Sequence, residues 1–220
     1  MNEDIMALSN KLIYSGRLKC GSEQVRDQKL VLQQAESSCS CSLSKLLDES
    51  VRCVFVNTDK LSARESRVGD LVQNEMEGKL VERFVATLVY RGIKQEDIGV
   101  ITPYRQQIKL LSAAVHNQNP LVEVLTADKS QGRDKDCIVI SMVRSNDVGN
   151  VGELLRDWRR INVSLTRAKK KLVIFGSRGT LQSDRLLSEF FDLMDGKGWI
   201  VDLLKSDEEC GCGRNDADDL

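Results

Sequence analysis

Short apolar runs alternate with longer amphipathic segments along most of this chain. The runs are rich in β-branched residues and end in turn-forming residues, which is typical of buried strands. Between them, apolar residues recur every three or four positions, which predicts helices that pack one side against a sheet. We expect strands at 51–56, 98–102, 122–125, 137–141, 172–176 and 199–203, and helices at 2–14, 71–91, 103–115, 159–171 and 181–194. This alternation predicts an α/β fold with a mostly parallel sheet covered on both faces.

Three divisions of the chain are expected. Residues 1–50 are interpreted as an N-terminal helix followed by a flexible surface insertion, because the part around the serine-rich run 37–42 is weakly patterned. Residues 51–205 hold the repeating pattern and form the main predicted domain. Residues 206–220 are acidic and are predicted to be a disordered tail.

Composition adds expectations about the core, membranes and metals. With 220 residues, 41% of them hydrophobic, the chain can bury one sizeable core. It has no apolar run near 18 residues, so we expect no membrane partner. Its seven cysteines form no CxxC pair and there is one histidine, so no metal site is predicted and the cysteines are expected to be reduced thiols.

One segment collects basic charge. Residues 156–171 include seven Arg or Lys residues and one acid, Asp157, so the segment carries +6 in a chain whose net charge is -1. On a helix, Ile161 and Leu165 would face the sheet while Arg167 lies on another side. A guanidinium held beside a phosphate site can stabilise the charge of a transferring phosphoryl group. The simpler alternative is a basic helix that binds nucleic acid or faces solvent.

Polar segments also follow three of the predicted strands, at 102–107, 126–134 and 144–146. Each of them alone is typical of an ordinary helix cap or turn. Parallel strands, however, bring their carboxyl ends to one edge of a sheet, where such folds bind their ligands. We therefore expect these three segments and the basic helix to lie together on one edge.

Taken together, these segments resemble the second motor domain of superfamily 1 helicases, in the branch related to RNA-surveillance and RecD-like helicases. The matching blocks are Ile101–Gln107, Thr126–Asp136 and Arg159–Lys169, the last with an N-V-x-L-T-R-A-K core. Extended matches at 5–14, 20–22, 143–146 and 152–160 are similar to the eukaryotic DNA replication helicase-nuclease family. The resemblance covers roughly residues 1–205 and implies a RecA-like three-layer fold.

The resemblance implies roles for individual residues. Arg167 resembles the arginine finger that reaches a nucleotide on the partner domain, and is the implied catalytic residue. Gly132, Asp134 and Arg105 resemble nucleotide-binding positions, with the glycine allowing close backbone approach and the acid accepting from a ribose hydroxyl. The implied nucleic-acid contacts are Thr102, Tyr104, Thr126, Gln131, Arg144 and Asn146.

The sequence contains no GxxxxGK[ST] phosphate loop, and no carboxylate pair that would hold magnesium is found. In the family these motifs precede the matched region, so we expect this chain to be a fragment, the second half of a motor, inactive by itself. ATP with Mg²⁺ would then be bound mainly by an upstream RecA-like domain.

The resemblance further implies a 5′ to 3′ DNA helicase-nuclease that acts in Okazaki-fragment processing and DNA repair. Its implied partners are single-stranded DNA, an upstream nuclease domain with an iron-sulfur cluster, and a single-strand-binding protein. The implied location is the nucleus, with the mitochondrion as a second candidate.

Two alternatives stay open. An RNA helicase of the surveillance type shares the core motifs, and phosphate contacts carry no base information. A catalytically silent nucleic-acid-binding module would also lack a phosphate loop.

Overall fold

The computed structural model describes residues 1–33 and 42–208, which fold around one six-stranded sheet. The strand order is β5-β4-β6-β7-β1-β8, and every neighbouring pair is parallel. The strands are β1 (Cys53–Asn57), β4 (Ile98–Ile101), β5 (Glu123–Leu125), β6 (Lys135–Ser141), β7 (Ala168–Gly176) and β8 (Ile200–Asp202). The predicted α/β fold is confirmed, since this is the RecA-like arrangement of a parallel sheet between helices.

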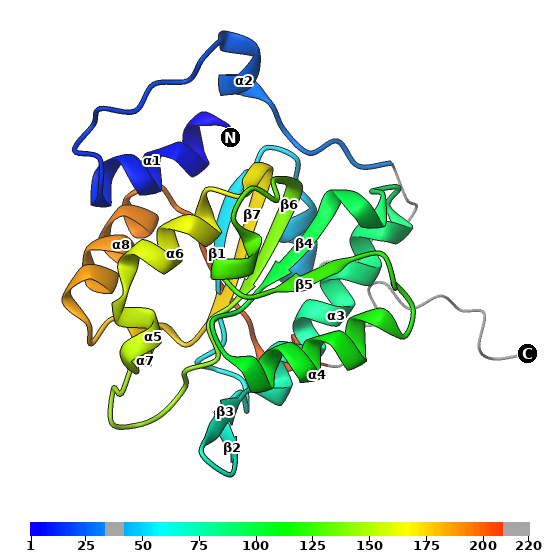
Figure 1. Cartoon of the computed structure of the whole chain (residues 1–220), viewed down its shortest axis with the longest axis vertical. Helices are drawn as coiled ribbons and strands as arrows, with labels where there is room; N and C mark the ends of the chain where they lie inside the picture. Colours follow the sequence, from blue (N-terminus) through cyan, green and yellow to red (C-terminus); the bar gives the residue numbers. More distant parts are fainter. Residues whose placement is uncertain (34–41, 209–220) are drawn as a thin grey trace, which may run out of the picture.

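Helices cover both faces of the sheet, giving three layers (Figure 1). One face is covered by α1 (Glu3–Leu12), α6 (Trp158–Leu165) and α8 (Arg185–Gly196), the other by α3 (Glu75–Tyr90) and α4 (Arg105–His116). Shorter elements connect these layers. They are α2 (Glu23–Asp27), α5 (Glu153–Arg156), α7 (Arg178–Leu181), α9 (Lys205–Glu208), and the 3-10 segments η1 (Ser42–Leu47), η2 (Gln95–Asp97) and η3 (Asp128–Ser130).

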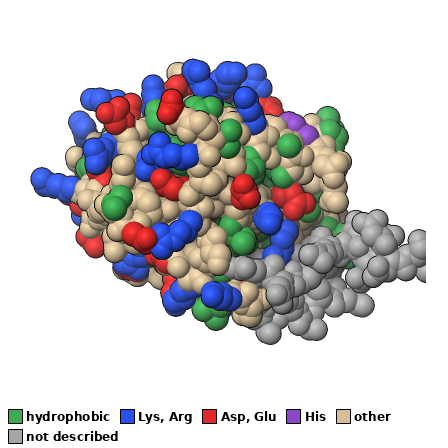
Figure 2. Space-filling view, turned by 90° about the horizontal axis from the view of Figure 1, so that it is seen from below, with side chains coloured by type: hydrophobic (Ala, Val, Ile, Leu, Met, Phe, Trp, Pro, Cys, Tyr) green, Lys and Arg blue, Asp and Glu red, His purple; other side chains and the backbone are tan. Residues whose placement is uncertain are grey.

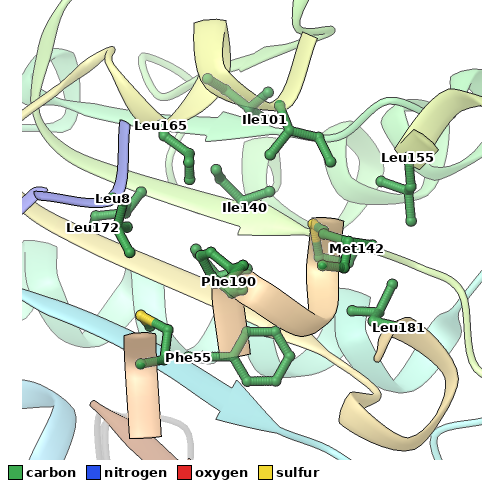
Figure 3. Close-up of a cluster of buried hydrophobic side chains, with 14 of the residues drawn as sticks. Leu8, Phe55, Ile101, Ile140, Met142, Leu155, Leu165, Leu172, Leu181 and Phe190 are labelled. Atoms are coloured by element: carbon green, nitrogen blue, oxygen red, sulfur yellow. The ribbon is translucent and has the colours of Figure 1, made fainter. Parts of the chain in front are cut away.

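The two cores follow from the alternation of side chains along each strand. In β1, Phe55 points into the core under α8, while Val54 and Val56 point into the core under α3. Figure 3 shows the first of these cores, in which the ring of Phe55 meets that of Phe191 edge to face with centroids 4.8 Å apart. Each strand therefore ties the helices of both faces to one sheet.

A β-hairpin replaces the first turn of one predicted helix. The strands β2 (Ser66–Val68) and β3 (Leu71–Gln73) pair antiparallel, so the expected helix start at residue 71 is wrong. The helix begins at Glu75 because the side chain of Asn74 caps it, accepting a hydrogen bond from the backbone N–H of Glu77 at 3.0 Å. Figure 1 shows the hairpin projecting from the rest of the domain.

The basic segment is a helix followed by a strand, and not one helix to residue 171 as expected. Helix α6 ends at Leu165 and β7 begins at Ala168, because Ala168 pairs with Lys135 of β6. Lys171 is consequently buried in the sheet, where its Nζ donates to the backbone carbonyls of Asp48 and Val51 at 3.0 and 2.6 Å.

The region around the serine-rich run also differs from the expected surface insertion. Leu30, Leu32 and Leu46 are buried in the core beneath α3, so these flanks belong to the fold. Residues 34–41, which hold most of the run, lie outside the described residues.

The start of the acidic tail is also part of the fold. Asp207 is buried and accepts hydrogen bonds from the backbone N–H groups of Ser42 and Leu204 at 3.0 and 2.8 Å. The prediction of disorder from residue 206 is therefore wrong for 206–208, and residues 209–220 lie outside the described part. Within the described part, no helix is both long and apolar enough to cross a bilayer.

Candidate functional site

The predicted arginine finger and the predicted ribose-binding acid lie side by side. The pairing of Lys135 with Ala168 places the residues just before them, Asp134 and Arg167, next to each other, and the N–H of Lys135 donates to the carbonyl of Arg167 at 3.0 Å. Nη1 of Arg167 donates to Oδ1 of Asp134 at 2.6 Å. The Arg167 side chain is 18% exposed and that of Asp134 is 50% exposed. Both groups can therefore be reached from solvent.

Two further contacts fix the guanidinium of Arg167. Its Nε donates to the carbonyl of Val163 at 3.2 Å, and Nη2 donates to the hydroxyl of Thr166 at 3.3 Å. Both acceptors belong to the end of α6 and its C-cap. The side chain is thus folded back on its own helix.

The backbone at Gly132, two residues before Asp134, has open space beside it. Its φ is +78°, in the left-handed region that favours glycine, and a Cβ added there would meet no atom within 4 Å. Gln131 beside it is also exposed. A ligand could approach this backbone closely, as the predicted role of Gly132 requires.

A groove lies between the start of α4, the η3 loop and the β2–β3 hairpin. Its volume is about 890 Å³, and its lining includes Leu71, Tyr104, Arg105, Thr126, Lys129 and Arg160. Within the described residues, Arg105 and Lys129 have no ion-pair partner, while Arg160 lies 3.6 Å from Asp128 and from Asp157. The groove therefore combines an apolar lining with basic groups that can bind phosphate oxygens.

The four polar elements do not share one edge of the sheet, so that expectation is wrong. Arg105 and Thr126 follow β4 and β5 at the carboxyl edge, whereas Asp134 and Arg167 precede β6 and β7 at the amino edge. The reason is that the segment after β5 packs against α6 through η3 and returns to the amino edge. Arg160 lies on α6, and Arg167 follows the C-cap of that helix and folds back on its last turn.

The charge of the basic segment is also distributed differently than its sequence indicated. Arg160 and Arg167 contact acids, Lys170 pairs with Asp136 at 2.7 Å, and Lys171 is buried. On the face seen in Figure 2, basic and acidic side chains are interspersed outside the grey atoms. Three of the seven basic residues of the segment therefore pair with acids, one is buried, and Arg156, Arg159 and Lys169 stay exposed without an ion-pair partner among the described residues.

Several predicted nucleic-acid contacts are turned into the protein. Thr102 is fully buried and its hydroxyl is 3.5 Å from the N–H of Tyr104, which is itself 8% exposed. Arg144 is 5% exposed, and the side chain of Asn146 bonds to Glu65 and to the backbone of Asn150. The polar atoms of Thr102, Arg144 and Asn146 are engaged by the protein in this structure, and their predicted contacts with nucleic acid, like that of Tyr104 on the groove, stay predictions. Thr126 on the groove and exposed Gln131 stay predictions.

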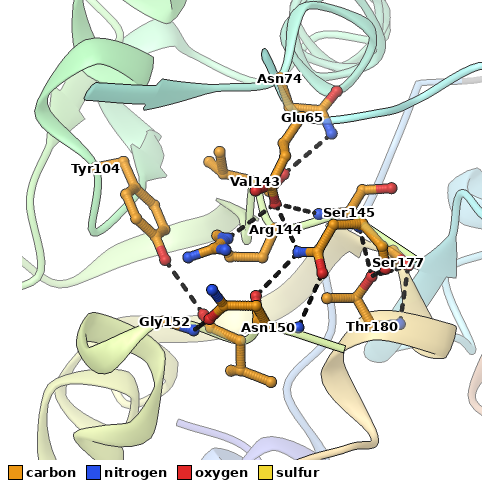
Figure 4. A network of polar contacts seen from close by, with 12 residues as sticks. Glu65, Asn74, Tyr104, Val143, Arg144, Ser145, Asn150, Gly152, Ser177 and Thr180 are labelled. Atoms are coloured by element: carbon orange, nitrogen blue, oxygen red, sulfur yellow. Dashed lines mark hydrogen bonds and ion pairs between the residues drawn. The ribbon is translucent and has the colours of Figure 1, made fainter. Parts of the chain in front are cut away.

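A buried polar network at the carboxyl edge explains why Arg144 and Asn146 point inward (Figure 4). One carboxylate oxygen of Glu65 accepts from Nε of Arg144 at 2.8 Å, from the N–H of Ser145 at 2.9 Å and from Nδ2 of Asn146 at 3.0 Å. Burial alone would raise the pKa of Glu65, but these hydrogen bonds outweigh it and hold that pKa below its usual value. Glu65 is thus an anchor for the loop after β6.

Gly152 makes room for the same arginine. Its φ is +76°, and an added Cβ would lie 2.3 Å from Nη1 of Arg144, so a side chain there would clash. The hydroxyl of Tyr104 closes the network on this side, 3.4 Å from the carbonyl of Val151. The loop after β6 is therefore packed around Arg144.

Glu77, at the start of α3, is a second buried acid that sequence reasoning missed. Its Oε2 accepts from the Ser141 hydroxyl at 2.6 Å and from the N–H of Val143 at 2.9 Å. Burial raises the pKa of Glu77 to about 7, although these hydrogen bonds oppose the shift. Val143 has φ of +69°, a strained value for a β-branched residue, so Glu77 helps to hold an unfavourable backbone.

Replacing Glu77 by glutamine should flatten the pH dependence of stability. Because the folded-state pKa is raised from 4.5 to about 7, the contribution of Glu77 is fully present below pH 4.5 and is lost as pH rises through 7. Urea unfolding of this chain between about pH 5 and 8 should show a fall in unfolding free energy of up to about 3 kcal/mol that Glu77→Gln lacks. If the unfolding free energy changes with pH by the same amount in both proteins, Glu77 is not the group responsible.

Metal binding has no candidate site in the described part of the chain. No group of three or more His, Cys, Asp or Glu side chains lies close enough together there to hold an ion.

Comparison with known proteins agrees with the geometry. A family described as an AAA domain matches residues 1–179. The DNA replication ATP-dependent helicase/nuclease dna2 of Schizosaccharomyces pombe is 43% identical over 215 residues, which covers 94% of this chain and 15% of the relative. JHS1 of Arabidopsis thaliana, with the same descriptive name, is 45% identical over 209 residues, 94% of this chain and 16% of the relative.

Human DNA2, also named a DNA replication ATP-dependent helicase/nuclease, is 40% identical over 223 residues, 96% of this chain and 21% of the relative. The chain therefore spans only about a sixth to a fifth of the length of these relatives. The family match, by contrast, includes the whole of the site described above. The chain belongs to this AAA-domain family, whose RecA-like helicase fold it has.

Proposed function

We propose that this chain is the second motor domain of an ATP-dependent DNA helicase/nuclease that moves 5′ to 3′ on single-stranded DNA. The observation that carries the proposal is the similarity, at 40–45% identity over 94–96% of the chain, to proteins named DNA replication ATP-dependent helicase/nuclease. The proposed roles of the whole protein are Okazaki-fragment processing and DNA repair, in the nucleus or the mitochondrion.

The residues at the site fit a shared nucleotide site. Gly132 is sterically open and is therefore available to a nucleotide. In this proposal Arg167 would contact phosphate oxygens, and Asp134 would accept from a ribose hydroxyl. Arg105 has no ion-pair partner within the described residues, but it lines the groove at the opposite edge of the sheet, so its predicted nucleotide contact requires a phosphate chain that extends to that edge. Hydrolysis of the bound ATP, which carries Mg²⁺, would supply the free energy for movement. Its phosphate loop and magnesium ligands would come from an upstream RecA-like domain.

The groove is the proposed path of the strand. Lys129 and Arg160 can contact backbone phosphates, and the apolar lining around Leu71 suits the faces of bases. Thr126 and Gln131 would add hydrogen bonds to the sugar-phosphate backbone. Further proposed partners are an upstream nuclease domain with an iron-sulfur cluster and a single-strand-binding protein.

The first test compares the longer protein containing this domain with the 220-residue chain. The longer protein should hydrolyse ATP faster when single-stranded DNA is added, and the chain alone should show no turnover because it lacks a phosphate loop. Steady-state ATPase assays with matched single-stranded DNA and RNA measure this. Stronger stimulation by RNA would instead support the RNA-helicase alternative, and turnover by the chain alone would contradict the shared site.

The second candidate function is a binding module that does not turn over ATP. The missing phosphate loop favours it. In that case Arg167→Ala would leave the cellular activity of the protein intact, whereas the motor proposal expects it to be lost.

A further inference from the structure

Arg167, the arginine needed for catalysis in the proposed function, is held by its own domain through all three guanidinium nitrogens. Its three guanidinium nitrogens each donate to a separate acceptor, namely the carboxylate of Asp134, the carbonyl of Val163 and the hydroxyl of Thr166. A guanidinium has five N–H donors in a fixed plane, and recognition of a phosphate uses them in pairs. In this conformation the carboxylate of Asp134 takes one N–H of Nη1, and its negative charge opposes the approach of a phosphate to that side of the guanidinium.

Of the three contacts of Arg167, the ion pair with Asp134 can open most easily. Its two basic neighbours do not compete for it, because Arg133 and Lys135 both pair with Glu123, at 2.9 and 3.0 Å. Its side chain is half exposed, whereas the other two acceptors are part of the α6 terminus and move only with that helix. The carboxylate therefore faces Arg167 on one side and solvent on the other.

We propose that Asp134 holds Arg167 in a parked position, and that the arginine reaches a nucleotide phosphate only when this ion pair opens. The inference rests on the proposed function and adds a regulatory role to the same site. Asp134 acts here as a positioning residue. The phosphate chain of a nucleoside triphosphate carries several negative charges, so it can displace one carboxylate from the guanidinium. The ion pair favours the parked conformation of Arg167 over the released one only modestly, because ion pairs that are this exposed change an equilibrium by less than about five-fold.

The test uses equilibrium binding in the longer protein, with a non-hydrolysable ATP analogue and ADP as probes. Asp134→Ala should tighten binding of the analogue relative to ADP by about two- to five-fold, because Arg167 no longer has to leave a partner. The same substitution combined with Arg167→Ala should leave no such gain. Weaker binding of both nucleotides by an equal factor, with an unchanged ratio, would overturn the inference and leave Asp134 with a ribose role alone.

A second measurement needs no nucleotide and uses the 220-residue chain. In an NMR spectrum of arginine side chains, the Nη1–H of Arg167, which donates to Asp134, should exchange with water more slowly than the Nη–H groups of exposed arginines, and Asp134→Ala should abolish the difference. The matched control is Asp136→Ala, which removes a neighbouring acid that pairs with Lys170. Unchanged exchange in Asp134→Ala, or an equal change in the control, would overturn the parked position.

These outcomes separate the inference from the proposed function. If Arg167→Ala alone leaves ATP turnover unchanged, the arginine is no finger and both fail. If Arg167→Ala abolishes turnover while Asp134→Ala changes neither the affinity ratio nor the exchange, only the parked position fails.

Discussion

Replacing Arg167 by alanine in the longer protein should lower kcat for ATP hydrolysis by about 10³- to 10⁵-fold. A finger guanidinium acts on charge that develops in the transition state, so its loss affects turnover more than substrate binding. Single-stranded DNA affinity should change little, because the basic groove is lined by other residues, among them Lys129 and Arg160. Steady-state ATPase kinetics and a DNA-binding titration measure the two effects separately.

The matched control is Arg159→Ala. Arg159 lies on α6, the helix that ends just before Arg167, is exposed, and has no ion-pair partner among the described residues, so its removal subtracts the same charge from the basic segment. Its kcat should stay within a few-fold of the unsubstituted protein. If the two variants lose similar activity, the effect is one of total charge and the finger assignment fails.

Replacing Glu65 by alanine should destabilise this chain by about 3–5 kcal/mol. Arg144 would keep its charge in a site where its side chain is only 6% exposed, with no carboxylate to compensate. Burial lowers the pKa of Arg144, but its hydrogen bonds to Glu65 and Tyr104 outweigh this and raise it, so the arginine stays charged. Urea unfolding of the 220-residue chain at neutral pH measures the loss.

An exposed ion pair nearby provides the control for this substitution. Arg64 pairs with Asp147, and their side chains are 65% and 77% exposed. Asp147→Ala should therefore destabilise the chain far less than Glu65→Ala does. If Glu65→Ala and Asp147→Ala lower the unfolding free energy by similar amounts, burial of Arg144 is not the reason for the destabilisation by Glu65→Ala.

Periodicity in the sequence was sufficient to predict a mostly parallel sheet covered by helices on both faces, whereas the order of the strands came from the structure. The apolar runs at 98–102 and 137–141 correspond to β4 and β6, because strands buried on both faces have few polar positions. Periodicity failed at residues 71–73, where Leu71 and Val72 fit a helix as well as a strand. Short apolar runs do not distinguish these structures, and the cap at Asn74 was the signal that could have done so.

The candidate site was predictable only in part. Motif order identified Arg167 and Asp134, but their contact depends on the register between β6 and β7, which includes an irregularity between Lys135 and Cys137. Motif order also predicted that Arg144 contacts nucleic acid, without showing which way its side chain points. Glu65 and Glu77 were missed because a single acid beside a turn or in the first turn of a helix is common on protein surfaces.

The backbone of Arg167 has a consequence for the speed of the proposed motor. Its carbonyl accepts from Lys135, so the main chain at this position is held by the sheet and only side-chain torsions are free to change. Rotamer changes of accessible side chains take picoseconds to nanoseconds, whereas two domains approach each other in microseconds to milliseconds. Opening and closing of the Asp134 pair would then be fast compared with domain closure, so the pair would not limit the rate of a catalytic cycle.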